Sequence, residues 1–376
     1  MKIYLDNAAT TPLDKAVFEA MTPYLLNHFG NPSSHHQVGR EAKAAIETSR
    51  KTIANLLGTL PDEIIFTSGG TEADNMAILS AVYASGVRNV ITTKFEHHAV
   101  LHTLEELEHK GDISLHYLEH DAKGTLDLAH LEHLLQNLPQ CLVSVMHANN
   151  EIGNLNDVVR IAEVCSRYHA LFHTDTVQTM GHYWFDLHMV PIHFITGSAH
   201  KFHGPKGVGF LYRRKGQPLS RLIHGGGQEK QLRAGTENLH GIVGMARALE
   251  LAYAELEAHQ SHIQQLKTRF INKIRETLPD VRFNGTSADP DKSLYTVLSV
   301  SLPDAGIDLL HYLDAEGIAV SGGSACSTGS ASHVLQALGH NPQRTTVRFS
   351  FSRFNTEEEI DQVIEKLTAV YKLVAA

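Results

Sequence analysis

Lys201 is a side chain whose setting in the sequence suggests chemistry. It lies in the stretch His193 to Tyr212 (HFITGSAHKFHGPKGVGFLY), where two apolar runs, Phe194-Ile195 and Val208 to Tyr212, flank a short polar turn. Gly204, with the proline and glycines that follow it, lets the backbone bend sharply there. A lysine presented from a strand-to-strand turn could form a Schiff base with an aldehyde cofactor. On turn chemistry alone, a solvated loop lysine is the commoner alternative.

Asp175 is a second candidate, near the end of the stretch Ala170 to Gln178 (ALFHTDTVQ). The apolar run before it predicts a strand, and open α/β sheets place ligand-binding groups at the carboxyl ends of their strands. An aspartate in that place can pair with the protonated pyridine nitrogen of pyridoxal 5'-phosphate (PLP) and keep the ring an electron sink. The alternative is an aspartate that only caps a helix.

The stretch Glu63 to Leu79 (EIIFTSGGTEADNMAIL) predicts a phosphate site. Ile64 to Phe66 indicates a buried strand and Gly69-Gly70 a tight turn. Thr71 and Asp74 match the S/T-x-x-D/E pattern of a helix start. Free N–H groups at such a start bind phosphate, although an ordinary capped helix is the commoner outcome. A phosphate cradle, a carboxylate and a lysine in this chain order together suggest a PLP enzyme.

Cys326 lies in the run SGGSACSTGSASHVL, which is rich in serine, glycine and alanine. Small polar neighbours would leave the thiol accessible and the backbone mobile, as a travelling nucleophile requires. The alternative, a small buried cysteine, is the role we expect for Cys141 beside Leu142-Val143 and for Cys165 within a helix.

The candidate residues all lie in a series of short sequence blocks. They run in order from Tyr4 to about Phe354, without a large insertion: YLDNAATTP, GNPSSHHQVGR, FTSGGTEADN, EHHAV, HANNEIG, HTDTVQ, SAHKFHGPKG, RAGTEN and SGGSACSTGS. The blocks resemble those of cysteine desulfurases, in the NifS/IscS-like subgroup of the PLP-dependent class V aminotransferases. The segment after Cys326 is about two residues shorter than in the common form of that subgroup, and loop length sets reach.

The resemblance implies an activity and its catalytic residues. L-cysteine would be converted to L-alanine, with the sulfur kept as a persulfide on Cys326 and passed to an iron–sulfur scaffold or a tRNA-thiolation enzyme. Lys201 would carry the cofactor and take the substrate Cα proton, and His97 would lie over the pyridoxal ring and transfer protons. An aminotransferase or β-lyase of the same fold is one alternative, and a sulfur-relay protein with little turnover is another.

The resemblance also implies the binding residues, position by position. Asn150 would contact the phenolic oxygen of the cofactor or the substrate, and Gln178 would support the same oxygen. Arg348 would hold the substrate carboxylate. Thr236 would reach the phosphate of the neighbouring subunit, so a homodimer is expected. The full set expected to bind the cofactor is Gly70, Thr71, His97, Asn150, Asp175, Gln178, Ser198, His200, Lys201 and Thr236.

Other classes of site find no support in the sequence. The histidines, 26 in all, are scattered, and there is neither an HExxH nor a paired CxxC motif, so no metal site is expected. The run Gly225 to Gly227 lacks the G-x-G-x-x-G spacing of a dinucleotide site. A net charge of -9 argues against direct binding of nucleic acid.

The start of the chain and its cysteine content bear on location. The amino terminus has no apolar signal region, and no apolar run is long enough to span a bilayer. Three cysteines make a disulfide framework improbable and fit a reducing compartment, so a cytoplasmic location is expected.

The elements that must position these residues follow from periodicity. With 42% hydrophobic residues over 376 positions, the chain can build a large core and two domains. Short apolar runs alternate with helical patterns up to about Tyr212, which predicts an α/β fold with a mostly parallel sheet. With the resemblance, this implies PLP fold type I, with a seven-stranded sheet in a large domain (14–254) and a smaller α+β domain (1–13 plus 255–376). The absence of glycine and proline between Gly244 and Pro279 predicts one long bridging helix.

Overall fold

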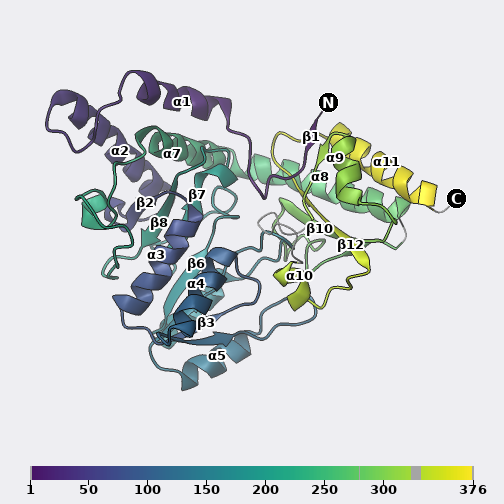
Figure 1. Ribbon diagram of the computed structural model, residues 1–376, viewed down its shortest axis with the longest axis horizontal. Helices are drawn as coiled ribbons and strands as arrows, with labels where there is room; N and C mark the ends of the chain where they lie inside the picture. Colours follow the sequence, from purple (N-terminus) through teal and green to yellow (C-terminus); the bar gives the residue numbers. More distant parts are fainter. Residues whose placement is uncertain (1, 279, 323–331, 375–376) are drawn as a thin grey trace.

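The computed structural model describes residues 2–278, 280–322 and 332–374, arranged as a large and a small unit side by side (Figure 1). The large unit is built on a seven-stranded sheet of order β2-β8-β7-β6-β5-β3-β4. All its strands run in one direction except β8, which is antiparallel to both its neighbours. The strands are β2 (Ile64–Thr67), β3 (Asn89–Thr92), β4 (Ser114–Tyr117), β5 (Cys141–Ser144), β6 (Leu171–Asp175), β7 (Phe194–Ser198) and β8 (Gly209–Arg213). The predicted mostly parallel seven-stranded sheet is confirmed.

Helices cover both faces of this sheet because strand side chains alternate between faces. Ile65, Leu142, Phe194 and Leu211 pack on α3 and α4, whereas their neighbours Phe66, Val143, Ile195 and Tyr212 belong to the core on the opposite face. The helices are α1 (Lys15–Leu26), α2 (Gln37–Leu56), α3 (Gly70–Tyr83), α4 (His98–His109), α5 (Leu128–Asn137), α6 (Val158–Arg167) and α7 (Leu239–Ala254), with short 3-10 turns at Pro61–Glu63, Ala199–Lys201 and Glu229–Gln231. A parallel sheet with helices on both faces opens toward ligands at the carboxyl ends of its strands.

The small unit has an antiparallel sheet of order β12-β10-β9. Helices α8 and α11 pack against it, and the rings of Phe270 and Phe349 lie 4.5 Å apart between helix and sheet. The elements are α8 (Leu256–Thr277), β9 (Arg282–Phe283), β10 (Val297–Pro303), α9 (Leu309–Ala315), β11 (Ile318–Ala319), α10 (His333–Ala337), β12 (Arg344–Ser350) and α11 (Glu357–Val374). The amino-terminal strand β1 (Ile3–Tyr4) pairs in parallel with β11, so the chain starts in this unit before crossing to α1.

The division into domains at 14–254 and 1–13 plus 255–376 stays a prediction, with support from the cores. One core joins residues from Val17 to Leu256, and a separate one joins Ile3 and Leu5 to residues 263–370. The predicted long helix between Gly244 and Pro279 is wrong in one respect: Glu255 leaves helical geometry, with φ -123° and ψ 24°, and separates α7 from α8. None of the described helices is long and apolar enough to cross a membrane.

Candidate active site

A cavity of about 330 Å³ lies where the carboxyl ends of the large sheet's strands meet the small unit and the amino-terminal segment. Ten of the residues predicted for the site line it: Gly70, Thr71, His97, Asn150, Asp175, Gln178, Ser198, His200, Lys201 and Arg348. They come from six separate stretches of the chain, so their convergence is a property of the fold. A larger hollow of about 570 Å³, beside Trp184, contains none of the predicted residues.

Lys201 ends the 3-10 turn that follows β7, and its Nζ donates to two backbone carbonyls, Ala8 O at 2.6 Å and Ala9 O at 2.9 Å. The turn after it needs glycine. A Cβ on Gly204 would come within 2.8 Å of the carbonyl oxygen of Ala199, and Gly207 has a φ of +77°. The antiparallel return into β8 therefore fixes the direction from which the amine enters the cavity.

Asp175 is the last residue of β6 and is buried. Its Oδ1 accepts a hydrogen bond from Val177 N at 2.8 Å, which orients the carboxyl group. Burial, reinforced by the neighbouring Asp74, raises the pKa of Asp175 to about 7. A cationic ring nitrogen beside this carboxylate would compensate the burial of its charge.

Asp74 lies behind Asp175, and its predicted role as part of a helix start is wrong. Helix α3 begins at Gly70 with Gly69 as an N-cap without a side chain, whereas Asp74 lies further along the helix, buried and lining the cavity. Burial raises the pKa of Asp74 to about 7, and its Oδ1 is 3.3 Å from Nε2 of His173. Burial lowers the pKa of His173 to about 4, so this is a buried neutral imidazole beside a carboxyl group that holds a proton easily.

The residues predicted to bind phosphate also line the cavity. The amino-terminal turn of α3 points its N–H groups there, beside the hydroxyl groups of Thr71 and Ser198 and the ring of His200. A Cβ on Gly70 would come within 2.6 Å of Val177, so glycine is required for this close approach. Burial and the charge of Lys201 lower the pKa of His200 to about 4. Its Nδ1 is 3.1 Å from the hydroxyl of Thr10.

His97 is the N-cap of α4, and its Nδ1 accepts a hydrogen bond from Ala99 N at 3.1 Å. This bond places the ring proton of the neutral imidazole on Nε2. Burial, followed by the charge of Lys201, lowers the pKa of His97 to about 4. His97 is therefore neutral at physiological pH. Glu96 fixes the turn before it, because its Oε1 accepts from Met146 N at 2.9 Å and from the Thr93 hydroxyl at 3.0 Å.

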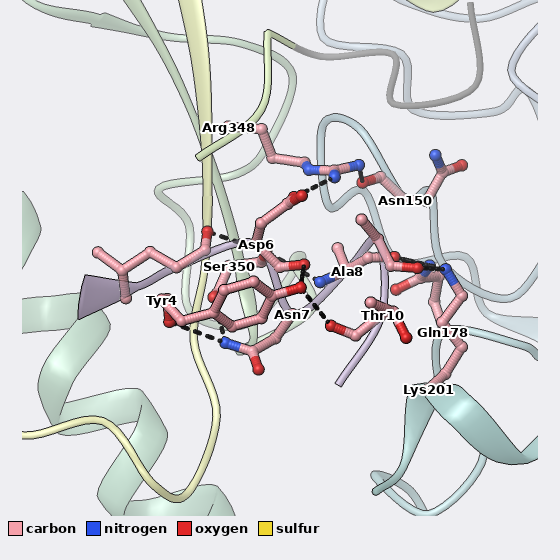
Figure 2. A network of polar contacts seen from close by, with 12 residues as sticks. Tyr4, Asp6, Asn7, Ala8, Thr10, Asn150, Gln178, Lys201, Arg348 and Ser350 are labelled. Atoms are coloured by element: carbon pink, nitrogen blue, oxygen red, sulfur yellow. Dashed lines mark hydrogen bonds and ion pairs between the residues drawn. The ribbon is translucent and has the colours of Figure 1, made fainter. Parts of the chain in front are cut away.

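Arg348 projects from β12 of the small unit to the edge of the cavity (Figure 2). Its Nη1 donates to the carbonyl oxygen of Asn150 at 2.9 Å, and its Nη2 pairs with Oδ1 of Asp6 at 2.8 Å. Gln178 donates from Nε2 to Ala8 O at 3.1 Å. The contacts of Asp6, Ala8 and Ala9 were missed from the sequence. Ala8 and Ala9 act through backbone carbonyls, which no side chain in the sequence signals, and the partner of the Asp6 carboxylate lies 342 positions away. All three residues belong to the YLDNAATTP block.

Two predicted residues are not placed at the cavity. Thr236 is exposed in the loop before α7 and is not among the lining residues. Cys326 lies outside the described residues. Its described flanks are held near the site, since Ser321 exchanges backbone hydrogen bonds with Arg348 and Nε2 of His333 is 3.0 Å from Glu96 O. Cys141 and Cys165 are buried, as predicted, and burial raises the pKa of both thiols.

Buried histidines predict an acid-sensitive fold. Burial lowers the pKa of seven described histidines to about 4 or below: His97, His147, His173, His182, His193, His200 and His203. Between about pH 6.5 and pH 4 the unfolded chain binds these protons and the folded protein does not, so each histidine removes about 1.4 kcal/mol of stability per pH unit of acidification. The raised pKa values of four acidic groups, Asp74, Glu96, Glu151 and Asp175, act in the opposite direction, and these groups are fewer than the seven histidines.

We therefore expect the urea midpoint of unfolding to fall steeply as the pH is lowered from 6.5 to 4. Equilibrium unfolding followed by circular dichroism at pH 7.0, 6.0 and 5.0 measures it. Equal midpoints at pH 7.0 and 5.0 would contradict the assignment of these histidines as buried and neutral.

Comparison with known proteins decides the family. The Aminotransferase class-V family matches residues 3–363. The chain belongs to this family. Cysteine desulfurase IscS of Dictyoglomus turgidum (strain DSM 6724 / Z-1310) is 42% identical to it, over 98% of this chain and 96% of that protein. A cysteine desulfurase of Sinorhizobium fredii (strain NBRC 101917 / NGR234) is also 42% identical, over 98% of this chain and 96% of its own.

Solved structures of similar proteins have the same fold as this class-V protein. A NifS-like protein superimposes with a TM-score of 0.91 at 38% identity, covering 99% of this chain and all of its own. SspA in complex with cysteine superimposes with a TM-score of 0.81 at 32% identity, covering 95% of this chain and all of its own. The resemblance inferred from the sequence blocks, and with it the predicted PLP fold type I, is confirmed.

The donor set of the cavity fits PLP. The amine of Lys201 suits the aldehyde, the buried carboxyl of Asp175 suits a protonated ring nitrogen, and the start of α3 suits the phosphate. Within the described parts of the chain, no three histidine, cysteine or acidic side chains are grouped to hold a metal ion.

Proposed function

We propose that this class-V protein is a PLP-dependent cysteine desulfurase, which converts L-cysteine to L-alanine and takes the sulfur as a persulfide on Cys326. The observation that carries the proposal is the convergence of Lys201, buried Asp175 and the start of α3 around one cavity, with Arg348 at its edge. The names of its relatives support the reaction, since proteins 42% identical over nearly the whole chain are called cysteine desulfurases.

The cofactor supplies the electron sink that makes the substrate Cα–H and Cβ–S bonds breakable. Asp175 would keep the ring nitrogen protonated, and Thr71, Ser198, His200 and the α3 amides would hold the phosphate. Arg348 and Asn150 hold the substrate carboxylate, which leaves Lys201 in position to take the Cα proton. His97 lines the cavity, and because its Nδ1 accepts from Ala99 N, its ring proton is held at Nε2, from which it would be transferred.

The nucleophile of the sulfur-transfer step is Cys326, in a segment that lies outside the described residues. The Cys326 thiolate attacks the substrate sulfur, one S–S bond forms, the Cβ–S bond breaks, and the alanine carbon skeleton takes up a proton. The attachment of the described flanks to Arg348 and Glu96 supports a role for this segment at the site. A sulfur-acceptor protein, either an iron–sulfur scaffold or a tRNA-thiolation enzyme, then removes the outer sulfur. A cytoplasmic location also remains part of the proposal.

The test is incubation of the PLP-loaded protein with L-cysteine, with and without a thiol reductant. L-alanine and sulfide in equal amounts support the desulfurase. Pyruvate, ammonia and sulfide would replace it with a β-lyase of the same fold, and amino transfer to a keto acid would replace it with an aminotransferase.

We also propose a homodimer with shared sites, which the family resemblance implies and which the exposure of Thr236 outside its own cavity supports. If Thr236 binds the phosphate in the partner's site, Thr236→Ala should weaken PLP binding about fivefold, the effect of one lost hydrogen bond. Mixed dimers of Lys201→Ala and Thr236→Ala should regain one intact site, because Lys201 and Thr236 of that site come from different chains.

Mixed dimers are made by dissociation and reassociation and verified by mass. PLP affinity and alanine release, both measured at limiting PLP, report the regained site. Verified mixed dimers no better than the Thr236→Ala parent would count against a shared site.

A further inference from the structure

The amino-terminal segment 4–12, here called the strap, crosses from the small unit to the large one between Arg348 and Lys201 (Figure 2). It is tied to the small unit by Asn7 Nδ2, which donates to Ser350 O at 2.8 Å. It is tied to the large unit by the Thr11 hydroxyl, which donates to His200 O at 2.9 Å. The strap is therefore fixed by hydrogen bonds to both units that border the cavity.

Arg348 contacts the strap through an ion pair with Asp6. The guanidinium is 1% exposed, and its nearest counter-ion is Asp6, at 2.8 Å from Nη2. Burial raises the pKa of Glu151 and the charge of Arg348 partly opposes this rise, but the Glu151 carboxylate accepts a hydrogen bond from the Ser332 hydroxyl. Nε of Arg348 is buried without a hydrogen-bond partner among the described residues. The buried cation thus has one close carboxylate and spare donor capacity at a cavity edge.

We propose that Asp6 stands in for the α-carboxylate of the amino-acid substrate: it neutralises and orients Arg348 in the empty site and competes with the carboxylate that arrives. This rests on the proposed function in so far as the ligand is an α-amino acid. Asp6 is a positioning residue that acts through Arg348. Because Ala8 and Ala9 of the same strap accept hydrogen bonds from Lys201, one segment positions both the carboxylate receptor and the amine.

Asp6→Asn removes the charge and keeps the shape. Before a ligand binds, Arg348 of this variant then lacks its close counter-ion. The free energy of binding a ligand carboxylate is therefore more favourable than in wild type. The probes are L-alanine and L-alaninamide, which differ only in the carboxylate. We expect L-alanine to bind Asp6→Asn about fivefold to tenfold more tightly than wild type, the effect of one partly buried ion pair, with no change for L-alaninamide.

Dissociation constants are measured on the PLP-loaded protein by calorimetry and by the change in its visible absorption. Thermal melts give a second readout, because saturating L-alanine should restore the melting temperature that Asp6→Asn loses and L-alaninamide should not.

Asp14→Asn is the matched control. Asp14 pairs with Arg353 and ties the start of α1 to the small unit without touching the cavity. It should leave both dissociation constants unchanged. Asp6→Glu keeps the charge and should stay within about twofold of wild type. Asp6→Ser carries the same expectation as Asp6→Asn and replaces it if that variant does not fold.

Unchanged or weaker L-alanine binding in the uncharged Asp6 variants overturns the proposal, as does equal tightening of both ligands. Neither measurement needs turnover, so a wild-type protein that forms no alanine from L-cysteine would refute the proposed reaction and leave this comparison readable.

Discussion

Cys326→Ser protein should bind PLP and L-cysteine as wild type does, yet release almost no L-alanine and carry no persulfide. A serine hydroxyl is a far weaker nucleophile toward sulfur than a thiolate, so alanine release should fall by about a thousandfold or more. The readouts are alanine formation from L-cysteine and mass spectrometry of wild-type peptides after a brief exposure to it. One extra sulfur should appear on the peptide that contains Cys326.

The control uses the other cysteines. Cys141 and Cys165 are buried, and burial raises the pKa of both thiols, so neither is a thiolate near neutral pH. Cys141→Ser should therefore keep wild-type alanine release. Extra sulfur on Cys141 or Cys165 would overturn the assignment of the persulfide to Cys326. Wild-type turnover by Cys326→Ser would overturn the persulfide mechanism in favour of a β-lyase. The substrate must be L-cysteine itself, since analogues with better leaving groups need no thiol attack.

Lys201→Ala protein should lose the visible absorption of its covalently held cofactor, together with at least about a thousandfold of activity. The amine enters the cavity lined by Asp175, and the removal of both the covalent link and the Cα base explains the size of the effect. Absorption spectra and borohydride reduction followed by peptide mapping measure it.

Lys206 is the matched control for this substitution. It lies on the same turn, is exposed, and does not line the cavity. Lys206→Ala should keep the absorption band and wild-type alanine release. A Lys201→Ala protein that remains yellow and is still fixed by borohydride would move the covalent site to another lysine.

The sequence by itself determined the elements and the residue types of the site. The runs around Ile65, Leu142 and Phe194 gave buried strands, because the period of apolar residues reflects burial directly. The position of Asp175 at a strand end and of Lys201 in a glycine-proline turn followed from the same local patterns. The long family resemblance added Arg348 and His97, which local pattern alone would have left as a surface arginine and a scattered histidine.

Only the tertiary structure decided which groups distant in the sequence pair as charges or hydrogen-bond partners. The S/T-x-x-D/E pattern suggested that Asp74 belongs to a helix start, but packing of α3 on the sheet buries Asp74 beside Asp175 and His173. The absence of glycine and proline suggested one helix where Glu255 divides two. Asp6 and the carbonyls of Ala8 and Ala9 reach Arg348 and Lys201 across more than 190 positions of sequence. Local periodicity records which side of an element is buried. Which charge faces which across a cavity depends on the packing of whole units, and no window of sequence contains that.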